Sequence, residues 1–437
     1  MLKSDRMLSE ISDELYGKLS QTPQNMTTLF VMAPIMCRFV LWVLQQAITA
    51  GKKRLYFLAR DGYSMYQTAC IFCEKWDLPI DCRYLYCSRY AWRSAEYCLL
   101  KEDSISYICL GGIEVTFEKM MRRAGLDATE TEVVAEAIGF EEDLNKPLAY
   151  NSVKDLAPRL RACPQFMNML ISHSEEKYHS VCGYLEQEGL LDGTGYAVVD
   201  SGWVGSMQQT LQNLVKSRGF QGEIEGYYFG MYEYPDEVNK STYYTWYFGP
   251  DEEIRRKVYF SNSLFECIFS SPEGMTIGYE KKNAKYEPIL EQKSNPNWKK
   301  IEQSTECLKK YAELLAGKEK SRIEQTAYKP REMAAELLYY FMGNPTVQEA
   351  ETFGNYIFCD DVIGEENQTV AAHLTHKEIK ENRFWQKSIN LLFKKKKPIK
   401  ESAWPEGSIM LDEQTGKKGL KHCAFYKYIL YWRKSMK

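Results

Sequence analysis

The chain has 437 residues, of which 44% are hydrophobic, 26% charged and 14% aromatic. These proportions are typical of a folded protein with room for two or three domains, and they exclude a disordered or collagen-like chain. The 13 cysteines are irregularly spaced, which favours reduced thiols over a disulfide scaffold. Cys70 and Cys73 form a CxxC motif, but no second CxxC completes a metal set, so we expect no zinc site.

The charge is divided unevenly along the chain. The net charge is −3, but residues 394–437 carry twelve Lys and Arg against four Asp and Glu, a net +8 that leaves −11 on the rest. This basic, aromatic tail predicts contact with an anionic membrane surface or with the protein's own acidic body. Because the body is acidic, the pattern does not favour nucleic acid as a partner.

Two features of the amino-terminal region bear on localisation. The first residues mix both charge signs and lack the apolar stretch of a signal peptide, so we expect a cytoplasmic protein, with the tail as a peripheral contact to the inner membrane face. Residues 29–44 are apolar but short for a membrane span and include Pro34 and Arg38. They predict a buried helix.

Helices and strands alternate through much of the chain. The apolar pattern predicts helices over 34–50, 63–75 and 206–216 and strands over 55–59, 83–87, 196–199 and 224–232. The strands are continuous apolar runs, as in buried parallel sheets. We therefore expect an α/β protein with a Rossmann-like, doubly wound, mainly parallel sheet, a helical insertion and a helical C-terminal region.

The same pattern divides the chain into five parts. Residues 1–110 form N-terminal helices and the first half of the α/β core, and 194–280 form the second half. Between them lies the helical insertion, 111–193. Residues 281–393 are a linker, 281–300, followed by a helical region, and 394–437 are the basic aromatic tail.

The first candidate site loop is LYFLARDGYSM, where a strand is followed directly by a helix. Ligands of parallel sheets bind at the carboxyl ends of strands, where helix amino termini attract phosphate. Arg60 can pair with a phosphate, Gly62 permits a tight turn beside Ser64, and Asp61 can hold a metal ion or act as a base. The structural alternative is that Asp61 caps the helix and pairs with Arg60.

The second candidate loop, YAVVDSGWVGSMQQTL, repeats this design. Asp200 ends a strand, and small residues follow before the helix, as in phosphate cradles. The predicted ligand-binding residues of this loop are Ser201, Gly202, Trp203, Gly205 and Ser206. The alternative is a strand-to-helix turn with Asp200 as cap and Trp203 as a packing residue.

Three further residues complete the predicted site. Arg89 and Arg93 follow the second strand and can reach the same sheet edge to bind an anion, or they are solvated surface arginines. Glu266 lies in an apolar segment, where an acid needs a partner, and is the third candidate catalytic acid beside Asp61 and Asp200. Asp61 and Asp200 are the candidate metal ligands.

Four blocks carry a resemblance over roughly residues 25–280: FVLWVLQQAITAGKKRLYFLARDGYSMYQ, RYLYCSRYAWR, VVDSGWVGSMQQTL and FECIFSSPEGMTIGYE. In this order they look like the region that follows the HAD-type domain in large bacterial proteins called predicted HAD-superfamily hydrolases, which are common in surface-polysaccharide gene clusters. Ala59 stands where the nucleophilic Asp of a HAD hydrolase would lie. The resemblance is therefore to the companion region rather than to the hydrolase domain.

A weaker similarity is to type I phosphoribosyltransferases, which have turns resembling ARDG and VVDSGWVGS. These resemblances imply an enzyme of bacterial surface-polysaccharide biosynthesis that acts on a phosphorylated sugar or a nucleotide-sugar-like substrate by phosphoryl or glycosyl transfer. Mg²⁺ is the candidate cofactor, and no dinucleotide is expected. The alternatives are a phosphoribosyltransferase-like enzyme and a non-catalytic binding or scaffold protein that retains a phosphate-binding crevice.

Overall fold

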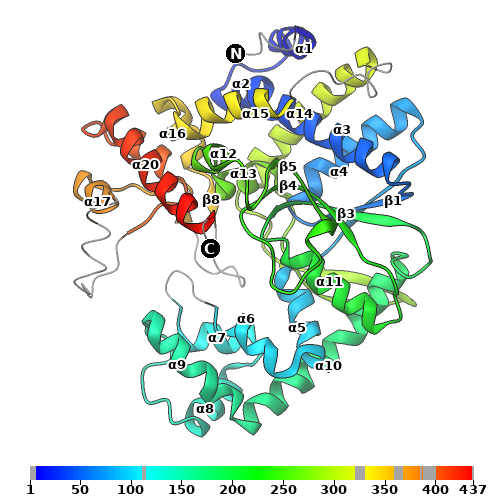
Figure 1. Cartoon of the computed structure of the whole chain (residues 1–437), viewed down its shortest axis with the longest axis vertical. Coiled ribbons are helices and arrows are strands. Elements are labelled where there is room, and N and C mark those ends of the chain that lie inside the picture. The colour runs from blue at the N-terminus through cyan, green and yellow to red at the C-terminus, as the bar shows by residue number, and fades with distance from the viewer. Residues whose placement is uncertain are drawn as a thin grey trace.

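A five-stranded, all-parallel sheet forms the centre of the molecule, with strand order β2-β1-β3-β4-β5 (Figure 1). The computed structural model describes residues 6–110, 115–319, 330–358, 368–383, 386 and 400–435. The strands are β1 (Arg54–Leu58), β2 (Asp81–Leu85), β3 (Tyr196–Trp203), β4 (Glu225–Met231) and β5 (Tyr243–Phe248). The mixed α/β class predicted from the sequence is confirmed, and β5 is a strand that was not among those predicted.

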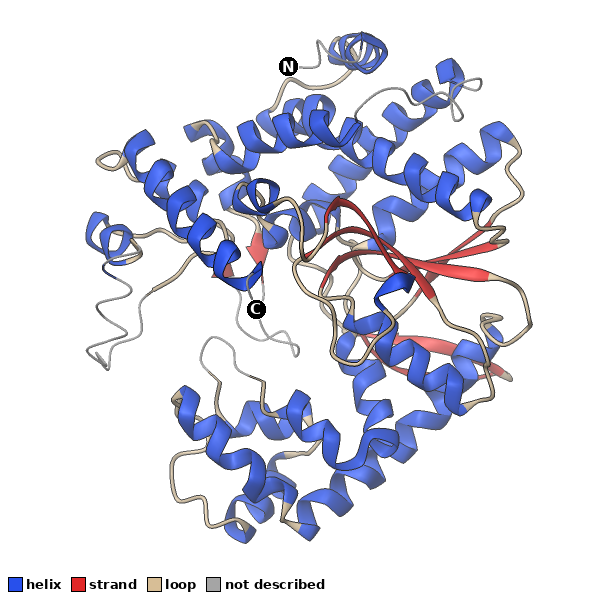
Figure 2. Ribbon diagram, in the orientation of Figure 1, coloured by secondary structure: helices blue, strands red, loops and turns tan. Residues whose placement is uncertain are grey.

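Helices cover both faces of this sheet, because successive side chains of each buried strand point to opposite faces (Figure 2). On one face Phe57 and Val199 pack against α3 (Ala33–Thr49), α4 (Gly62–Trp76) and α14 (Trp298–Glu319). On the other face Tyr56 and Val198 pack against α5, α10 and α11. The bounds of these three helices are Arg89–Leu100, Pro164–Gln187 and Ser206–Ser217.

The segment predicted as an insertion is helical and has an apolar core of its own. Its shorter helices are α7 (Phe117–Arg123), α8 (Ala128–Ala137) and α9 (Tyr150–Arg161), and α6 (Ile105–Ile108), which lies just before it, packs into the same core. Phe117, Met120 and Met121, which the sequence places on one helical period, are buried in this second core. The long helix α10 then returns along α5 to the sheet (Figure 1).

The apolar N-terminal segment is part of the main core. After α1 (Arg6–Tyr16), α2 (Pro23–Thr27), a π-helical turn (Thr28–Met32) and α3 form a continuous helix. In the part of the chain that the structure describes, it is the one helix long and apolar enough to cross a membrane, but 83% of its most apolar window is buried in the molecule. That burial favours the predicted core helix.

The linker expected over residues 281–300 was wrong, because β6 (Thr276–Lys282) and β7 (Lys285–Leu290) form an antiparallel hairpin. Asn283 and Ala284 both have positive φ, the conformation of a two-residue hairpin turn. The polar sequence and Pro288 suit a two-stranded ribbon, where a proline can occupy an edge. The hairpin packs on the α5 and α10 side of the sheet.

The remaining elements build the C-terminal region. They are α12 (Ile254–Val258), α13 (Asn262–Phe269), α15 (Pro330–Leu338), a π-helical turn (Tyr339–Gly343), α16 (Val347–Gly354), β8 (Ile357–Phe358), β9 (Gln368–Thr369), α17 (His376–Glu381), α19 (Pro405–Leu411) and α20 (Gly416–Ser435). The basic run Lys394–Lys397 lies outside the described residues.

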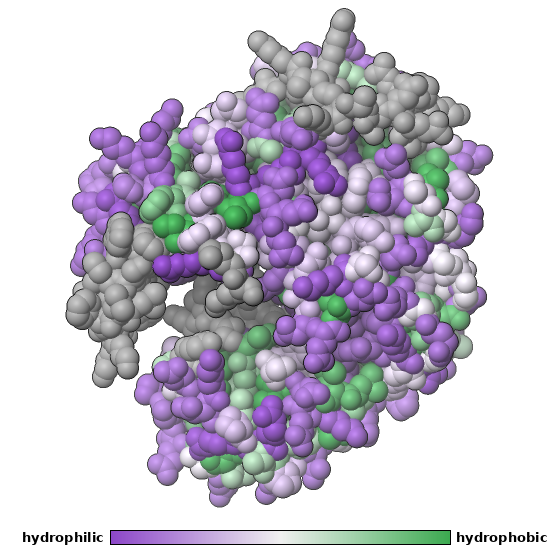
Figure 3. Space-filling view, in the orientation of Figure 1, coloured by the Kyte–Doolittle hydropathy of each residue, from purple (hydrophilic) through white to green (hydrophobic). Residues whose placement is uncertain are grey.

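Helix α20, the described end of the tail, docks on the body of the protein. Lys427 Nζ lies 2.7 Å from Glu406 Oε1 of α19, and Lys434 lies 3.7 Å from Glu233. The ring of Tyr431 stacks on that of Tyr232 at a centroid distance of 5.5 Å. Hydrophobic side chains interrupt the hydrophilic surface over this helix (Figure 3).

The hairpin makes a testable contribution to stability through Tyr279, whose buried hydroxyl donates to Tyr86 O at 2.7 Å and accepts from Trp92 Nε1 at 2.9 Å. Tyr279→Phe leaves both partners unsatisfied. We expect the free energy of unfolding to fall by about 1–3 kcal/mol in urea denaturation. Tyr244→Phe, at a side chain 38% exposed, is the control. Equal losses in the two variants would contradict a structural role for the hairpin.

Candidate active site

The two predicted loops meet at the carboxyl edge of the sheet because β1 and β3 are parallel, hydrogen-bonded neighbours. Phe57 of β1 pairs with Val199 of β3, so the residues that follow in each strand emerge at the same edge. There the hydroxyl of Ser201 donates a hydrogen bond to the Asp61 carboxylate. Asp61 and the β3 loop therefore belong to one site.

Glu266 reaches this site from α13, and the indole N–H of Trp203 donates a hydrogen bond to its carboxylate. The end of β3 bends sharply here: Gly202 and Trp203 both have positive φ, at 108° and 65°. A Cβ at Gly202 would lie 2.5 Å from the carbonyl oxygen of Gly230. Glycine at this position allows the bend that directs Ser201 to one acid and Trp203 to another.

The three carboxyl groups are half-buried, and the charge of Asp61 acts on the other two. Burial, together with the negative charge of Asp61, raises the pKa of Asp200 to about 7 and that of Glu266 to about 8. Burial also raises the pKa of Asp61, but the Ser201 hydroxyl and the charges of Arg60 and Arg89 lower it. Glu266 thus holds a proton at neutral pH.

Arginines face the acids from two sides. Arg60 and Arg89 are exposed, and their charges lower the pKa values of both Asp61 and Glu266. The charge of Arg89 also acts on Asp200. The site therefore combines proton-carrying acids with cations that remain exposed to an anionic ligand.

Arg93 extends this cationic surface to the amino terminus of α11. Its Nη2 donates to Ser206 Oγ at 2.9 Å, and its guanidinium lies over the Tyr107 ring, 4.3 Å from the centroid. Burial and the neighbouring Arg89 lower the pKa of Arg93. Its Nε is buried without a hydrogen-bond partner in the described part of the chain. Gly205, with φ of 71°, is the N-cap that starts α11 beside it.

A buried carboxylate holds α5, the helix that carries Arg89 and Arg93, in place. Glu96 of α5 is 1% exposed and accepts hydrogen bonds from Thr210 Oγ1 and Asn213 Nδ2 of α11, both at 2.7 Å. Burial raises the pKa of Glu96. This contact fixes α5 against α11, and with it the position of Arg93 beside Ser206.

The capping alternatives for the two aspartates do not match the contacts. Asp61 stands at the N-cap of α4, but its side chain makes no capping hydrogen bond. Asp200 lies inside β3, and the N-cap of α11 is Gly205. Neither carboxylate is therefore engaged in capping a helix, and both can act in the site.

Two predicted residues serve the packing of α4 instead. A Cβ at Gly62 would lie 2.9 Å from the backbone carbon of Phe57, so glycine permits the close approach of helix and strand. Ser64 is 1% exposed, and its hydroxyl lies 3.4 Å from Thr305 Oγ1 of α14. Ser64 is thus buried in a helix contact and does not face the acids.

Sequence reasoning missed a group of tyrosines beside the first loop. Tyr63 and Tyr84 lie edge to face at 5.8 Å, Tyr84 and Tyr86 at 5.1 Å, and the Tyr86 hydroxyl bonds the Glu273 carboxylate. Burial is the main cause that raises the pKa of Tyr86 to about 12, so its hydroxyl stays protonated and can donate. The available signal was the tyrosine alternation in RYLYC, which places Tyr84 and Tyr86 two residues apart, within and just beyond β2.

No group of three or more His, Cys, Asp and Glu side chains is arranged to hold a metal ion within the described ranges.

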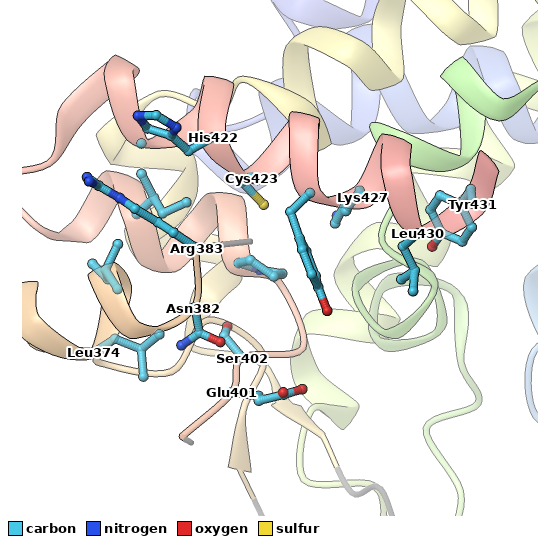
Figure 4. A pocket seen from close by; sticks show the side chains of 15 residues that line it. Leu374, Asn382, Arg383, Glu401, Ser402, His422, Cys423, Lys427, Leu430 and Tyr431 are labelled. Atoms are coloured by element: carbon cyan, nitrogen blue, oxygen red, sulfur yellow. The ribbon is translucent and has the colours of Figure 1, made fainter. Parts of the chain in front are cut away.

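A separate cavity of about 230 Å³ lies in the C-terminal region, between α17, α19 and α20 (Figure 4). Cys423 and Lys427 of α20 line it opposite Asn382 and Ser402. None of the predicted site residues lines this cavity.

No protein-family model matches the chain, and no curated protein matches it significantly.

The raised carboxyl pKa values predict how stability depends on pH. From about pH 4.5 to 8 Glu266 is ionised in the unfolded chain but protonated in the folded one, so the free energy of unfolding falls as pH rises. The slope for one such group is at most about 1.4 kcal/mol per pH unit, reduced by water that reaches the half-buried carboxyl.

Glu266→Gln keeps an acceptor for Trp203 but cannot ionise. Urea denaturation at pH 5, 6.5 and 8 should therefore give a shallower fall for this variant, and greater stability than wild type at pH 8. The control is Glu413→Gln, at an exposed residue. Parallel pH dependences of wild type and Glu266→Gln would show that Glu266 ionises normally in the folded protein.

Proposed function

We propose that this protein is an enzyme of bacterial surface-polysaccharide biosynthesis that transfers a glycosyl or phosphoryl group from a phosphorylated sugar or a nucleotide-sugar-like substrate. The observation that carries the proposal is the cluster of three interacting carboxyl groups, Asp61, Asp200 and Glu266, beside accessible arginines. Acids with raised pKa values in a cleft are typical of general acid–base chemistry, and arginines there suit a phosphate-bearing substrate.

The finer fold assignment, a Rossmann-like doubly wound domain, belongs to the same proposal. It is supported by the strand order, in which β3 lies beyond β1 while β2 lies on its other side. In doubly wound sheets this reversal of direction opens a crevice where ligands bind. Asp61 follows β1 and Asp200 lies in β3, on the two sides of that point.

The phosphate of the substrate binds Arg89 and Arg93 at the amino terminus of α11. That end of the helix offers unpaired backbone N–H groups, and Ser206 and the small residues around Gly205 allow close approach. The tyrosines Tyr63 and Tyr86 flank the first loop and supply rings and hydroxyls suited to a sugar.

The acids divide the proton transfers. Glu266, protonated at neutral pH, donates to the leaving-group oxygen, and ionised Asp61 stabilises the positive charge that develops on the sugar or accepts the proton of the attacking group. Asp200, with a pKa of about 7, can exchange protons with either. Trp203 and Ser201 are positioning residues, since each hydrogen-bonds one acid.

Mg²⁺ remains a proposed cofactor, bound by Asp61 and Asp200. Two carboxylates, with no third protein ligand among the residues that the structure describes, suit Mg²⁺, which keeps several waters and commonly takes its remaining ligands from substrate phosphates. Binding of the ion would therefore depend on the phosphorylated substrate.

A thermal-shift screen of nucleotide sugars, sugar phosphates and phosphoribosyl pyrophosphate, each with and without Mg²⁺, tests the proposal. We expect one class to stabilise the wild-type protein and Arg89→Ala to weaken that ligand at least tenfold. Lys216→Ala, an exposed cation at the other end of α11, should bind as wild type. No response to any phosphorylated ligand, or equal losses in both variants, would contradict the proposed site.

Catalysis is separated from binding by Asp200→Asn and Glu266→Gln. Each should retain binding within a few-fold and lower turnover by about 10²–10⁴, the usual contribution of a general acid or base. Asp200→Asn should also keep or raise the melting temperature of the free protein. Wild-type binding without turnover would favour the scaffold alternative, and turnover of phosphoribosyl pyrophosphate the phosphoribosyltransferase alternative.

We also propose that α20 holds this cytoplasmic protein at the inner membrane face. Lys421, Tyr428 and Trp432 follow one stripe of the helix and are exposed, with Lys417 and Lys418 one turn before them. Lysines and aromatic rings are the residues that bind anionic headgroups at an interface. The contacts of Lys427 and Tyr431 with the body lie on another side of the helix and leave this stripe open.

Co-sedimentation with phosphatidylserine vesicles at low salt tests this partner. Lys417→Gln with Lys421→Gln should weaken binding about 30-fold, since each lysine near an anionic leaflet contributes about 1 kcal/mol. The matched control is Lys216→Gln with Lys293→Gln, which removes the same charge elsewhere. If wild type does not pellet, or both double variants pellet as wild type does, the membrane role is wrong.

A further inference from the structure

A cluster of three thiols lies between α4 and the edge strand β2. Cys70 and Cys73 are three residues apart on α4 and so share one face of the helix, and Cys82 is the second residue of β2. The sulfur atoms of Cys73 and Cys82 lie 3.7 Å apart, in direct contact. Cys70 also bonds the Cys82 thiol, so Cys82 is the partner common to both helix cysteines.

The cluster differs from the other cysteines that line the core. Cys37, Cys87 and Cys307 are fully buried, whereas Cys70, Cys73 and Cys82 are all partly exposed to solvent. The described cysteines are free thiols, and the three at this edge are not arranged with a further Asp, Glu or His as a metal site within the described ranges. Contact and exposure together indicate thiol chemistry rather than packing alone.

The surroundings distinguish the three sulfurs. The hydrogen bond from Cys82 and, more weakly, one with Tyr66 lower the pKa of Cys70 to about 7, against opposing effects of burial and of Glu74. The same contacts with Cys70 and Cys73, with burial, raise the pKa of Cys82. Cys70 is therefore the thiolate of the cluster, and Cys82 keeps its proton and donates it.

We propose that Cys70, Cys73 and Cys82 form a redox-modification site in which a peroxide drives formation of a disulfide between α4 and Cys82 of β2. This site is separate from the carboxylates, because α4 begins beside Asp61, whereas Cys70 and Cys73 lie in its second half and Cys82 lies at the start of β2.

The chemistry is balanced by the cluster and one peroxide. The Cys70 thiolate attacks hydrogen peroxide, the O–O bond breaks, and Cys70 becomes a sulfenic acid. The hydroxide released combines with the proton that Cys70 lost on ionising and leaves as water. The Cys82 sulfur then attacks the Cys70 sulfur, the S–O bond breaks, and hydroxide leaves as water with the Cys82 proton. Two thiols and one hydrogen peroxide thus give one disulfide and two waters.

Cys73 can then replace Cys70 by thiol–disulfide exchange. It lies against Cys82, and its attack on the Cys82 sulfur releases the Cys70 thiolate without further oxidation. A disulfide needs sulfurs about 2 Å apart, which side-chain rotation can supply from the observed contact. The bond ties the C-terminal half of α4 to the outer strand of the sheet.

Peptide mapping of the full-length protein tests the site directly. Trypsin cleaves after Arg60, Lys75 and Arg83, so Cys70 and Cys73 fall in one peptide and Cys82 in the next. After brief treatment of the folded protein with a small excess of hydrogen peroxide, mass spectrometry should find these two peptides joined, and dithiothreitol should separate them. Separate peptides with Cys82 still a free thiol would overturn the proposal.

Variants identify the partners. Cys82→Ser and Cys70→Ser should each abolish the joined peptides after this brief treatment, whereas Cys73→Ser should leave the Cys70–Cys82 disulfide. Cys98→Ser, at a partly exposed thiol on α5, is the control and should form the disulfide as wild type does. Persistence of the joined peptides in Cys82→Ser would contradict the assignment. If a variant does not fold, the wild-type map still decides.

Discussion

The hydrogen-bonded pairing of β1 with β3 is the constraint on which the candidate site depends. The two strands are separated by more than a hundred residues of chain, including the whole insertion, yet they are parallel neighbours in the sheet. Their pairing brings Asp61 and Ser201 into contact and leaves Asp200 beside them. Without this pairing, Asp61 and Asp200 would belong to loops that do not meet.

That arrangement opposes stability. Burial raises the pKa values of all three acids, and the charge of Asp61 raises those of Asp200 and Glu266 further, which means that the folded protein is destabilised when they ionise. Arg60 and Arg89 offset part of this cost but remain exposed rather than closing into buried ion pairs. Such a cluster is retained in a fold when a ligand or a reaction needs it, which is why it carries the proposed function.

The parts of the fold that could be predicted are those that local sequence determines. β1 and β3 are continuous apolar runs, and α4 and α11 follow them at once, so their presence and order were evident. The prediction of a linker over residues 281–300 was wrong because the segment forms a two-stranded ribbon. Its strands have polar exposed faces and include Pro288, so they contain no apolar run that would have revealed them. β5 was missed although its sequence, YYTWYF, is aromatic or β-branched at every position and so carries a strand signal of its own.

The candidate site could be predicted as a set of residue types, but not as a set of contacts. Asp61, Asp200 and Glu266 were identifiable as polar residues in apolar surroundings. The hydrogen bond from Trp203 to Glu266 depends on a sharp bend at Gly202 and on how α13 packs, and both are tertiary facts. For the same reason Ser64 looked like a loop ligand until α14 was seen to cover it.

The insertion has a mechanical connection to the site through α5. This helix carries Arg89 and Arg93 at its first turns and leads into the insertion at its other end, where Ser174 of α10 bonds both Cys98 N and Ala95 O. The arginines and the insertion are therefore positioned by one and the same helix. The affinity for an anion and the orientation of the insertion are then coupled. If a ligand binds one orientation more tightly, a partner that holds the insertion in that orientation raises the affinity for the ligand by the same free energy.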